Sequence, residues 1–94
     1  MNWTVEIAKK VLRKLNKVPE KVQLALLALT QELEKRGPVQ GKWPNYSKLK
    51  GRQNQHHCHL VKGKNTYVAV WEVDDKKIKF IEVIYVGTHE KAPY

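Results

Sequence analysis

The residues best suited to chemistry lie in one short stretch, from His56 to Lys64, which reads His-His-Cys-His-Leu-Val-Lys-Gly-Lys. Imidazole transfers protons near neutral pH, and lysine side chains stabilise negative charge that develops on an oxygen atom. Successive side chains of a strand point to opposite faces, so His57 and His59 would share one face, with His56 and Cys58 on the other. One pair of imidazoles can therefore line a cleft together.

Positive charge is concentrated around this stretch. Residues 42 to 64 contain six Lys or Arg and no Asp or Glu, in a chain of 94 residues whose net charge is +9. Cations beside titratable imidazoles favour a polyanionic ligand, with RNA as the first candidate. The candidate phosphate contacts are Lys50, Arg52, Lys62 and Lys64. A pI near 9.8 gives any chain some affinity for nucleic acid, so charge by itself does not establish function.

A cysteine beside three histidines also raises the possibility of zinc, which binds Cys and His in tetrahedral sites. These four residues alternate between two faces of one strand, so we expect no metal site and no cofactor. A single cysteine allows no internal disulfide and fits a reducing compartment. The first residues lack the pattern of a signal peptide, and the longest apolar run, Leu24–Leu29, is too short to span a membrane. We therefore expect a cytoplasmic protein.

Periodicity predicts one α+β domain over residues 1–94. Alternating apolar residues predict a short strand at Trp3–Ile7, although a helix beginning at Thr4 is the alternative. Apolar residues at helical spacing predict one helix over Ala8–Asn16 and a second from Pro19 to Arg36, which Gly37-Pro38 ends. Two amphipathic helices joined by a tight turn need a sheet to cover.

The second half of the chain predicts that sheet. Val39–Arg52 is an irregular link with a short turn at Ser47–Leu49. Three strands are then expected at Gln55–Val61, Thr66–Val73 and Ile78–Val86, the last two joined by a hairpin turn over residues 74–77. The predicted order is strand, helix, helix and three strands, in a largely antiparallel sheet with the helices on one face.

This order, together with particular residues, resembles the RelE/ParE superfamily of bacterial toxins from toxin–antitoxin pairs. The resembling segments are Leu49–Gly51 at the entry to the sheet, Tyr67–Val73 before an acidic turn, and Val86-Gly87-x-His89-x-Lys91-x-x-Tyr94 after an apolar strand. The resemblance implies one of two activities. RelE-like and HigB-like members cleave messenger RNA, usually in the ribosomal A site and without a metal, whereas ParE-like members inhibit DNA gyrase.

The resemblance also implies roles for single residues. His89 takes the place of an arginine of RelE-type toxins, Tyr94 matches a terminal tyrosine, and Lys91 adds an RNA-binding candidate. The chain departs from the pattern at Val68, where an arginine is often found. It departs again where His57 and His59 replace a basic pair, unless that pair is displaced to Lys62 and Lys64.

The sequence therefore favours a metal-independent endoribonuclease toxin that acts on ribosome-bound mRNA and inhibits translation. The catalytic candidates are His57, His59, His89 and Tyr94. The expected partners are an antitoxin that is acidic where it covers the basic cleft, the ribosome and mRNA, with no membrane. The alternatives are a ParE-like gyrase inhibitor and a degenerate, RNA-binding member of the fold. For the single residues, the alternative interpretations are a solvated polar face for His57 and His59, a loop histidine for His89, and a packing residue or frayed end for Tyr94.

Overall fold

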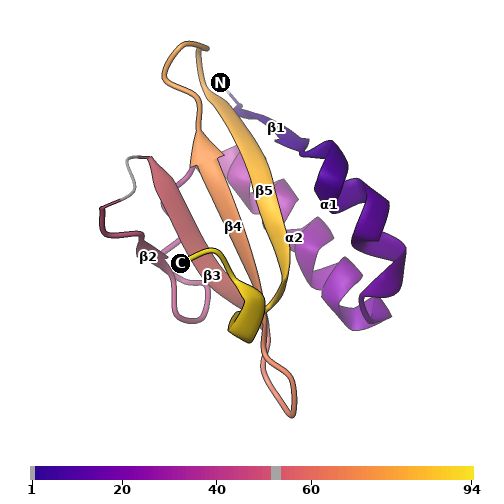
Figure 1. Cartoon of the computed structure of the whole chain (residues 1–94). Coiled ribbons are helices and arrows are strands. Elements are labelled where there is room, and N and C mark those ends of the chain that lie inside the picture. The colour runs from indigo at the N-terminus through magenta and orange to yellow at the C-terminus, as the bar shows by residue number, and fades with distance from the viewer. Residues whose placement is uncertain (1, 52–53) are drawn as a thin grey trace.

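A mixed sheet organises the chain. A computed structural model describes residues 2–51 and 54–94, which form a five-stranded sheet with the order β1-β5-β4-β3-β2. The elements are β1 (Thr4–Ile7), α1 (Lys9–Lys14), the 3-10 helix η1 (Leu15–Lys17), α2 (Glu20–Arg36), β2 (Ser47–Lys48), β3 (Gln55–Val61), β4 (Tyr67–Val73), β5 (Phe80–Thr88) and the 3-10 helix η2 (His89–Lys91). Both α-helices lie on one side of the sheet, and the chain end crosses the other side (Figure 1). The predicted α+β architecture is confirmed.

The second helix provides most of the contact with the sheet. Pro19 precedes α2, where its missing N–H costs nothing, and Glu20 lies in the first turn, at the positive end of the helix dipole. The apolar stripe predicted for this helix consists of Val22, Leu26, Leu29 and Leu33, widened by Ala25 and Leu27. The first four are buried, whereas Leu27 is 55% exposed, so its place in the stripe was predicted wrongly. The four buried side chains pack against the sheet residues Cys58, Leu60, Ala69, Trp71, Ile81 and Val83 to form the core.

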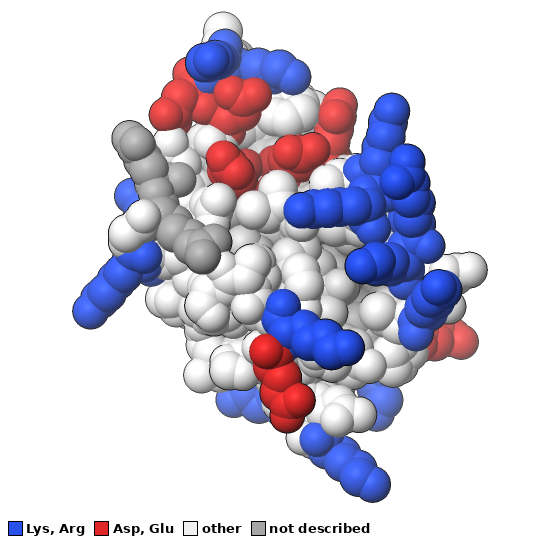
Figure 2. All heavy atoms as spheres, viewed as in Figure 1, with Lys and Arg blue, Asp and Glu red and all other residues white. Residues whose placement is uncertain are grey.

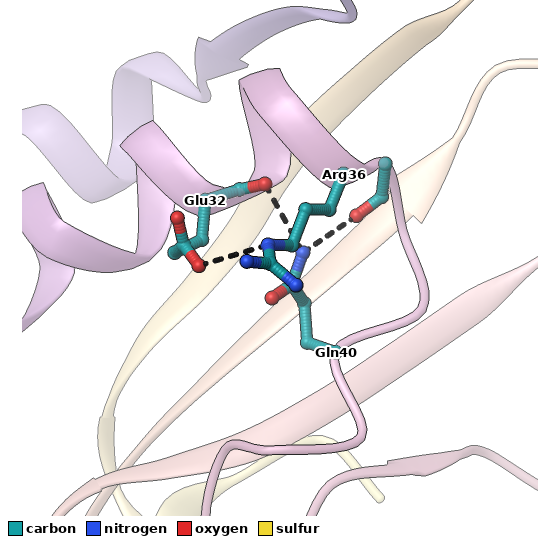
Figure 3. A network of polar contacts seen from close by, with 4 residues as sticks. Glu32, Arg36 and Gln40 are labelled. Carbon is teal, nitrogen blue, oxygen red and sulfur yellow. Dashed lines mark hydrogen bonds and ion pairs between the residues drawn. The ribbon is translucent and has the colours of Figure 1, made fainter.

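Helix α2 ends at a glycine that no other residue could replace without strain. Gly37 has a φ of +86°, and a Cβ atom built on it would lie 2.7 Å from the indole nitrogen of Trp3. The side chain of Gln40 then caps the helix, because its amide nitrogen donates to the carbonyls of Gly37 at 2.8 Å and Glu32 at 3.2 Å. An ion pair of 3.3 Å between Arg36 and Glu32 adjoins this cap (Figure 3). The start of the link is thereby fixed against the helix.

The first strand pairs with the last one. Strand β1 runs parallel to β5, with Val5 opposite Ile81, and the other neighbours in the sheet are antiparallel. The strand interpretation of the N-terminus is therefore correct, and the helix alternative at Thr4 is wrong. The first helix is shorter than predicted, because α1 ends at Lys14 and the chain continues as the 3-10 helix η1. Leu12, predicted to belong to its apolar stripe, is 52% exposed.

Two boundaries differ from the sequence expectation. The last strand begins at Phe80, and Ile78 is 88% exposed in the preceding turn. The Asp74 carboxylate accepts a 2.9 Å hydrogen bond from the backbone N–H of Lys76, and Lys79 has a φ of +49°, so the turn extends beyond residue 77. The short turn expected at Ser47–Leu49 is instead the two-residue strand β2, which pairs with His56 and His57.

The sheet has a helix face, covered by α2, and an open face, which carries His57 and His59. Cross-strand partners share a face, so Val70, opposite His57, and Val68, opposite His59, also lie on the open face. Both valines are fully buried although they lie outside the core under α2. The chain end crosses this face in Figure 1. None of the helices in the described part of the chain has the length and apolar character that a bilayer crossing requires.

Candidate functional site

Strand β3 separates its histidines as predicted. His57 and His59 are half-buried on the open face, whereas His56 and Cys58 are buried on the helix face, at 5% and 0% exposure. Successive side chains of a strand point to opposite faces, which is enough to separate the two pairs. The pair on the open face is therefore available to a ligand, and the pair on the helix face is not.

The register of the last two strands brings His89 to the same place. Val68 lies opposite both His59 on β3 and Gly87 on β5, so these three residues form one row across the sheet. Two residues after Gly87 the chain turns, and the backbone N–H of His89 donates to the carbonyl of Thr66 at 2.9 Å. The centroid of the His89 ring lies 5.5 Å from that of His59, with the ring planes at 70°.

Four predicted site residues thus form one group, called here the histidine cluster: His57, His59, His89 and Tyr94. The rings of His57 and His59 are 6.2 Å apart. The C-terminal Tyr94 lies 4.6 Å from His57 and presents its edge toward His89 at 6.1 Å. The structure brings these residues together, although they come from β3, η2 and the chain end. Their catalytic role remains a prediction.

A pocket of about 340 Å³ lies beside the cluster and is called here the histidine pocket. Its lining residues are His59, Lys64, Asn65, Thr66, Thr88, His89 and Glu90. Two imidazoles, a lysine and several hydrogen-bonding side chains therefore meet at one hollow, which suits a phosphate group and its attached sugar. The Glu90 carboxylate also lines the pocket, and its negative charge would repel a phosphate group.

The predicted cations are distributed unevenly around the pocket. Lys64 lines it, and Lys62 is close enough that its charge lowers the pKa of His59. Lys50 and Lys91 are exposed and do not line it. Arg52 lies outside the described residues.

The protein lowers the pKa of both cluster histidines on β3. For His59 the causes are burial first, and then the charges of His89, His57 and Lys62. For His57 burial lowers the pKa, a hydrogen bond with the Ser47 carbonyl raises it, and the charge of His89 lowers it. Both rings therefore favour the neutral state, in which an imidazole nitrogen can accept a proton.

Sequence reasoning missed Ser47. The Nδ1 atom of His57 lies 3.1 Å from the Ser47 hydroxyl and 3.3 Å from the Ser47 carbonyl oxygen. Ser47 reaches this position because β2 pairs it directly with His57. The link carries no periodicity, so nothing in the sequence identified that pairing. The buried Nδ1 atom of His59, by contrast, has no hydrogen-bond partner in the described part of the chain.

The fourth histidine, His56, is buried and packs against aromatic residues of the protein interior. The rings of His56, Tyr46 and Trp71 pack against one another as a group of three: His56 lies 5.9 Å from Tyr46 and 6.0 Å from Trp71, and Tyr46 lies 6.1 Å from Trp71. The Nδ1 atom of His56 is 2.7 Å from the Tyr46 hydroxyl. Trp71 is fully buried and donates to the Pro38 carbonyl at 3.0 Å. This stack holds the link against the helix face, so Tyr46 and Trp71 are not free to stack on RNA bases.

Cys58 is a core residue. It is fully buried beneath α2, and burial raises the pKa of its thiol to about 12. A protonated thiol is a poor metal ligand. Residues 2–51 and 54–94 contain no group of three or more His, Cys, Asp or Glu side chains arranged to hold a metal ion.

Charge is polarised over the surface. Figure 2 shows acidic side chains gathered near the β4–β5 turn, where Glu72, Asp74, Asp75 and Glu82 line a hollow. The same view shows cations along the side where α1 lies, and α1 exposes Lys9, Lys10, Arg13 and Lys14. The basic character of α1 was visible in the sequence, but the strongest predicted concentration was residues 42 to 64.

Comparison with known proteins identifies the fold. The chain has a TM-score of 0.74 to a free mutant of the E. coli toxin RelE, with 21% identity over 96% of this chain and 86% of that one. It has a TM-score of 0.71 to the archaeal RelE–RelB complex from Pyrococcus horikoshii, with 22% identity over 98% and 100%. A YoeB dimer from Staphylococcus aureus gives 0.68, with 14% identity over 95% and 99%. No family model and no curated sequence matches the chain. The chain therefore has the RelE/ParE-like toxin fold, as its sequence predicted.

Proposed function

From this fold we propose that the chain is the toxin of a type II toxin–antitoxin pair, and that it is a metal-independent endoribonuclease. It would cleave ribosome-bound mRNA in the cytoplasm and thereby inhibit translation. The observation that carries the proposal is the pair His59 and His89, 5.5 Å apart, at a pocket that also contains Lys64. A fold shared with RelE and YoeB toxins supports it, but the fold by itself does not select a chemistry.

The reaction assigned to this site is attack by an RNA 2′-hydroxyl on the neighbouring phosphorus. One imidazole accepts the hydroxyl proton while the bond from the 2′-oxygen to phosphorus forms. The other imidazole, in its charged form, donates a proton to the 5′-oxygen as the bond from phosphorus to that oxygen breaks. The products are a 2′,3′-cyclic phosphate and a 5′-hydroxyl. Both proton transfers use protein side chains, so the step needs no metal.

The charges around the pocket would stabilise and orient the substrate. Lys64 would neutralise charge that grows on the phosphorane, and Lys62 would contact a neighbouring phosphate. The acidic hollow at the β4–β5 turn repels an RNA strand, which favours placement of the strand at the histidine end of the open face. Lys50 and Lys91 would contact the strand farther from the pocket.

The proposed protein partner is a cognate antitoxin. The archaeal structure that this fold matches contains RelE in complex with RelB. For this chain we propose a partner segment that carries acidic residues where it covers the histidine cluster. Such a segment would neutralise the cations and exclude RNA at once.

Primer extension on mRNA paused on ribosomes, in the presence of EDTA, tests the nuclease. The wild-type chain is compared with His89→Ala and with Lys35→Ala, an exposed substitution on α2 that serves as the control. Cuts at A-site codons that disappear only in His89→Ala are expected. Cuts that persist in His89→Ala would move the chemistry to His57 and His59. A folded wild-type chain that makes no cuts would refute the nuclease, and gyrase supercoiling would be the next assay.

A further inference from the structure

The histidine pocket contains every group that the proposed reaction needs. His59 and His89 supply the two proton transfers and Lys64 supplies a cation, and all three line the same hollow. Asn65, Thr66 and Thr88 add polar groups that can hydrogen-bond a sugar or a phosphate. No step of the reaction therefore requires a group from a second macromolecule.

The two imidazoles are placed to work as an acid and a base together. Their centroids are 5.5 Å apart, and burial and the charge of His89 lower the pKa of His59, which favours the neutral, proton-accepting form of His59. The proposed reaction uses the state in which one ring is neutral and the other is protonated. That state holds both the proton acceptor and the proton donor of the reaction. Rings at this separation can also both reach oxygen atoms of one phosphate, given a hydrogen-bond reach of about 3 Å.

The protein also fixes the backbone that carries both rings before any substrate arrives. His59 is in the interior of β3 and is paired with Val68 on the central strand β4. The backbone N–H of His89 donates a 2.9 Å hydrogen bond to the carbonyl of Thr66, the residue directly before β4. Because the scaffold already holds the two histidines near each other, less conformational entropy is lost when they meet the substrate. A ribosome is then not needed to bring these groups together.

The pocket is open to a flexible strand. Lys64, Asn65, His89 and Glu90 are exposed, and the volume of about 340 Å³ is at the lower end of the range for small-ligand sites. A single strand can unstack and turn its backbone so that the attacking and leaving oxygens lie in line, which a regular duplex opposes. Single-stranded RNA is thus the substrate class that this site suits.

We propose that this chain cleaves free single-stranded RNA without a ribosome. The inference rests on the proposed function, since it uses the same site and the same transesterification. It goes beyond that function, because it assigns the whole catalytic apparatus to the chain itself. Ribosome-bound mRNA is then one substrate among accessible single strands.

The test uses the purified chain of residues 1–94, a synthetic single-stranded RNA and EDTA, in a ribosome-free buffer of low ionic strength. A second oligonucleotide carries 2′-deoxyribose at every position, and ribosome-bound mRNA is assayed in parallel. Cleavage of the free RNA to fragments ending in a 2′,3′-cyclic phosphate is expected, with none of the DNA. His59→Gln and His89→Gln should each slow it by about 100-fold or more, while Lys35→Ala leaves it unchanged. Circular dichroism confirms that each variant is folded.

The outcomes separate the inference from the proposed function. Cleavage of ribosome-bound mRNA alone would overturn the inference and leave the proposed function standing. Cleavage of neither substrate by a folded chain would overturn both. Cleavage of free RNA that is equally fast in His59→Gln and His89→Gln would place the activity outside the pocket and would also overturn the inference.

Discussion

The ring of the last residue, Tyr94, lies against the imidazole of His57, with centroids 4.6 Å apart and ring planes tilted by 52°. Tyr94 is 42% exposed, so one part of its ring is accessible to solvent while another part packs on His57. This contact covers one side of the imidazole of His57, a member of the histidine cluster. The chain end therefore controls the surroundings of His57.

Removal of the Tyr94 ring should raise the pKa of His57. Burial is the largest cause that lowers this pKa, so Tyr94→Ala, which uncovers the imidazole, should return the value toward that of an exposed histidine. Tyr94→Phe keeps the ring and should leave the pKa near the wild-type value. An NMR titration of His57 measures both. Equal pKa values in the wild type and in Tyr94→Ala would show that the ring does not desolvate His57.

Ser47 should fix the tautomer of His57. A carbonyl oxygen can only accept, so the 3.3 Å contact between His57 Nδ1 and the Ser47 carbonyl is favourable when Nδ1 carries the proton. The basic lone pair then belongs to Nε2. Nitrogen-15 NMR of the neutral ring should show a protonated Nδ1, and Ser47→Ala, which keeps the carbonyl, should preserve that state. A ring protonated at Nε2 would contradict this assignment.

The rate of RNA cleavage should depend on pH through the cluster histidines. A general base acts unprotonated, and the pKa of His59 is lowered by burial, by His89 and His57, and by Lys62. As the pH is decreased, the rate should therefore begin to fall at a pH below the ordinary pKa of histidine. Lys62→Ala removes one of the lowering charges, so its acid limb should move to higher pH by less than about one unit.

Lys64→Ala serves as the comparison, because it should reduce the maximal rate through loss of a phosphate contact. High salt should weaken the effect of Lys62 by screening. An acid limb that moves to lower pH in Lys62→Ala would contradict the electrostatic account of His59.

His56 should make the fold less stable in acid. Burial and the charge of Lys48 lower its pKa in the folded state, so the unfolded chain binds the proton more readily. Its contribution is undiminished above the ordinary pKa of about 6.5 and is lost progressively as the pH falls from there toward the folded value. Urea unfolding at several pH values measures this loss. His56→Phe keeps an aromatic ring against Tyr46 and Trp71 and should flatten the pH dependence over that window.

The sequence by itself determined the long helix, the four longer strands and which side chains share a face of the sheet. Side-chain periodicity is local, so the spacing of Val22, Leu26, Leu29 and Leu33 was enough to place one face of α2 on the sheet. The same local rule placed His57 and His59 together and apart from Cys58. Resemblance to RelE-type toxins then pointed to His89 and Tyr94, which the structure locates beside the strand histidines.

The tertiary structure decided which of these groups meet. The 5.5 Å contact between His59 and His89 joins residues on different elements, and it depends on the row formed by His59, Val68 and Gly87 and on the turn after Thr88. The register of strands is set by packing over the whole sheet, which no local pattern encodes. For the same reason the pairing of Ser47 with His57 was not predicted, and Lys64 could not be distinguished from Lys50 as the cation that lines the pocket.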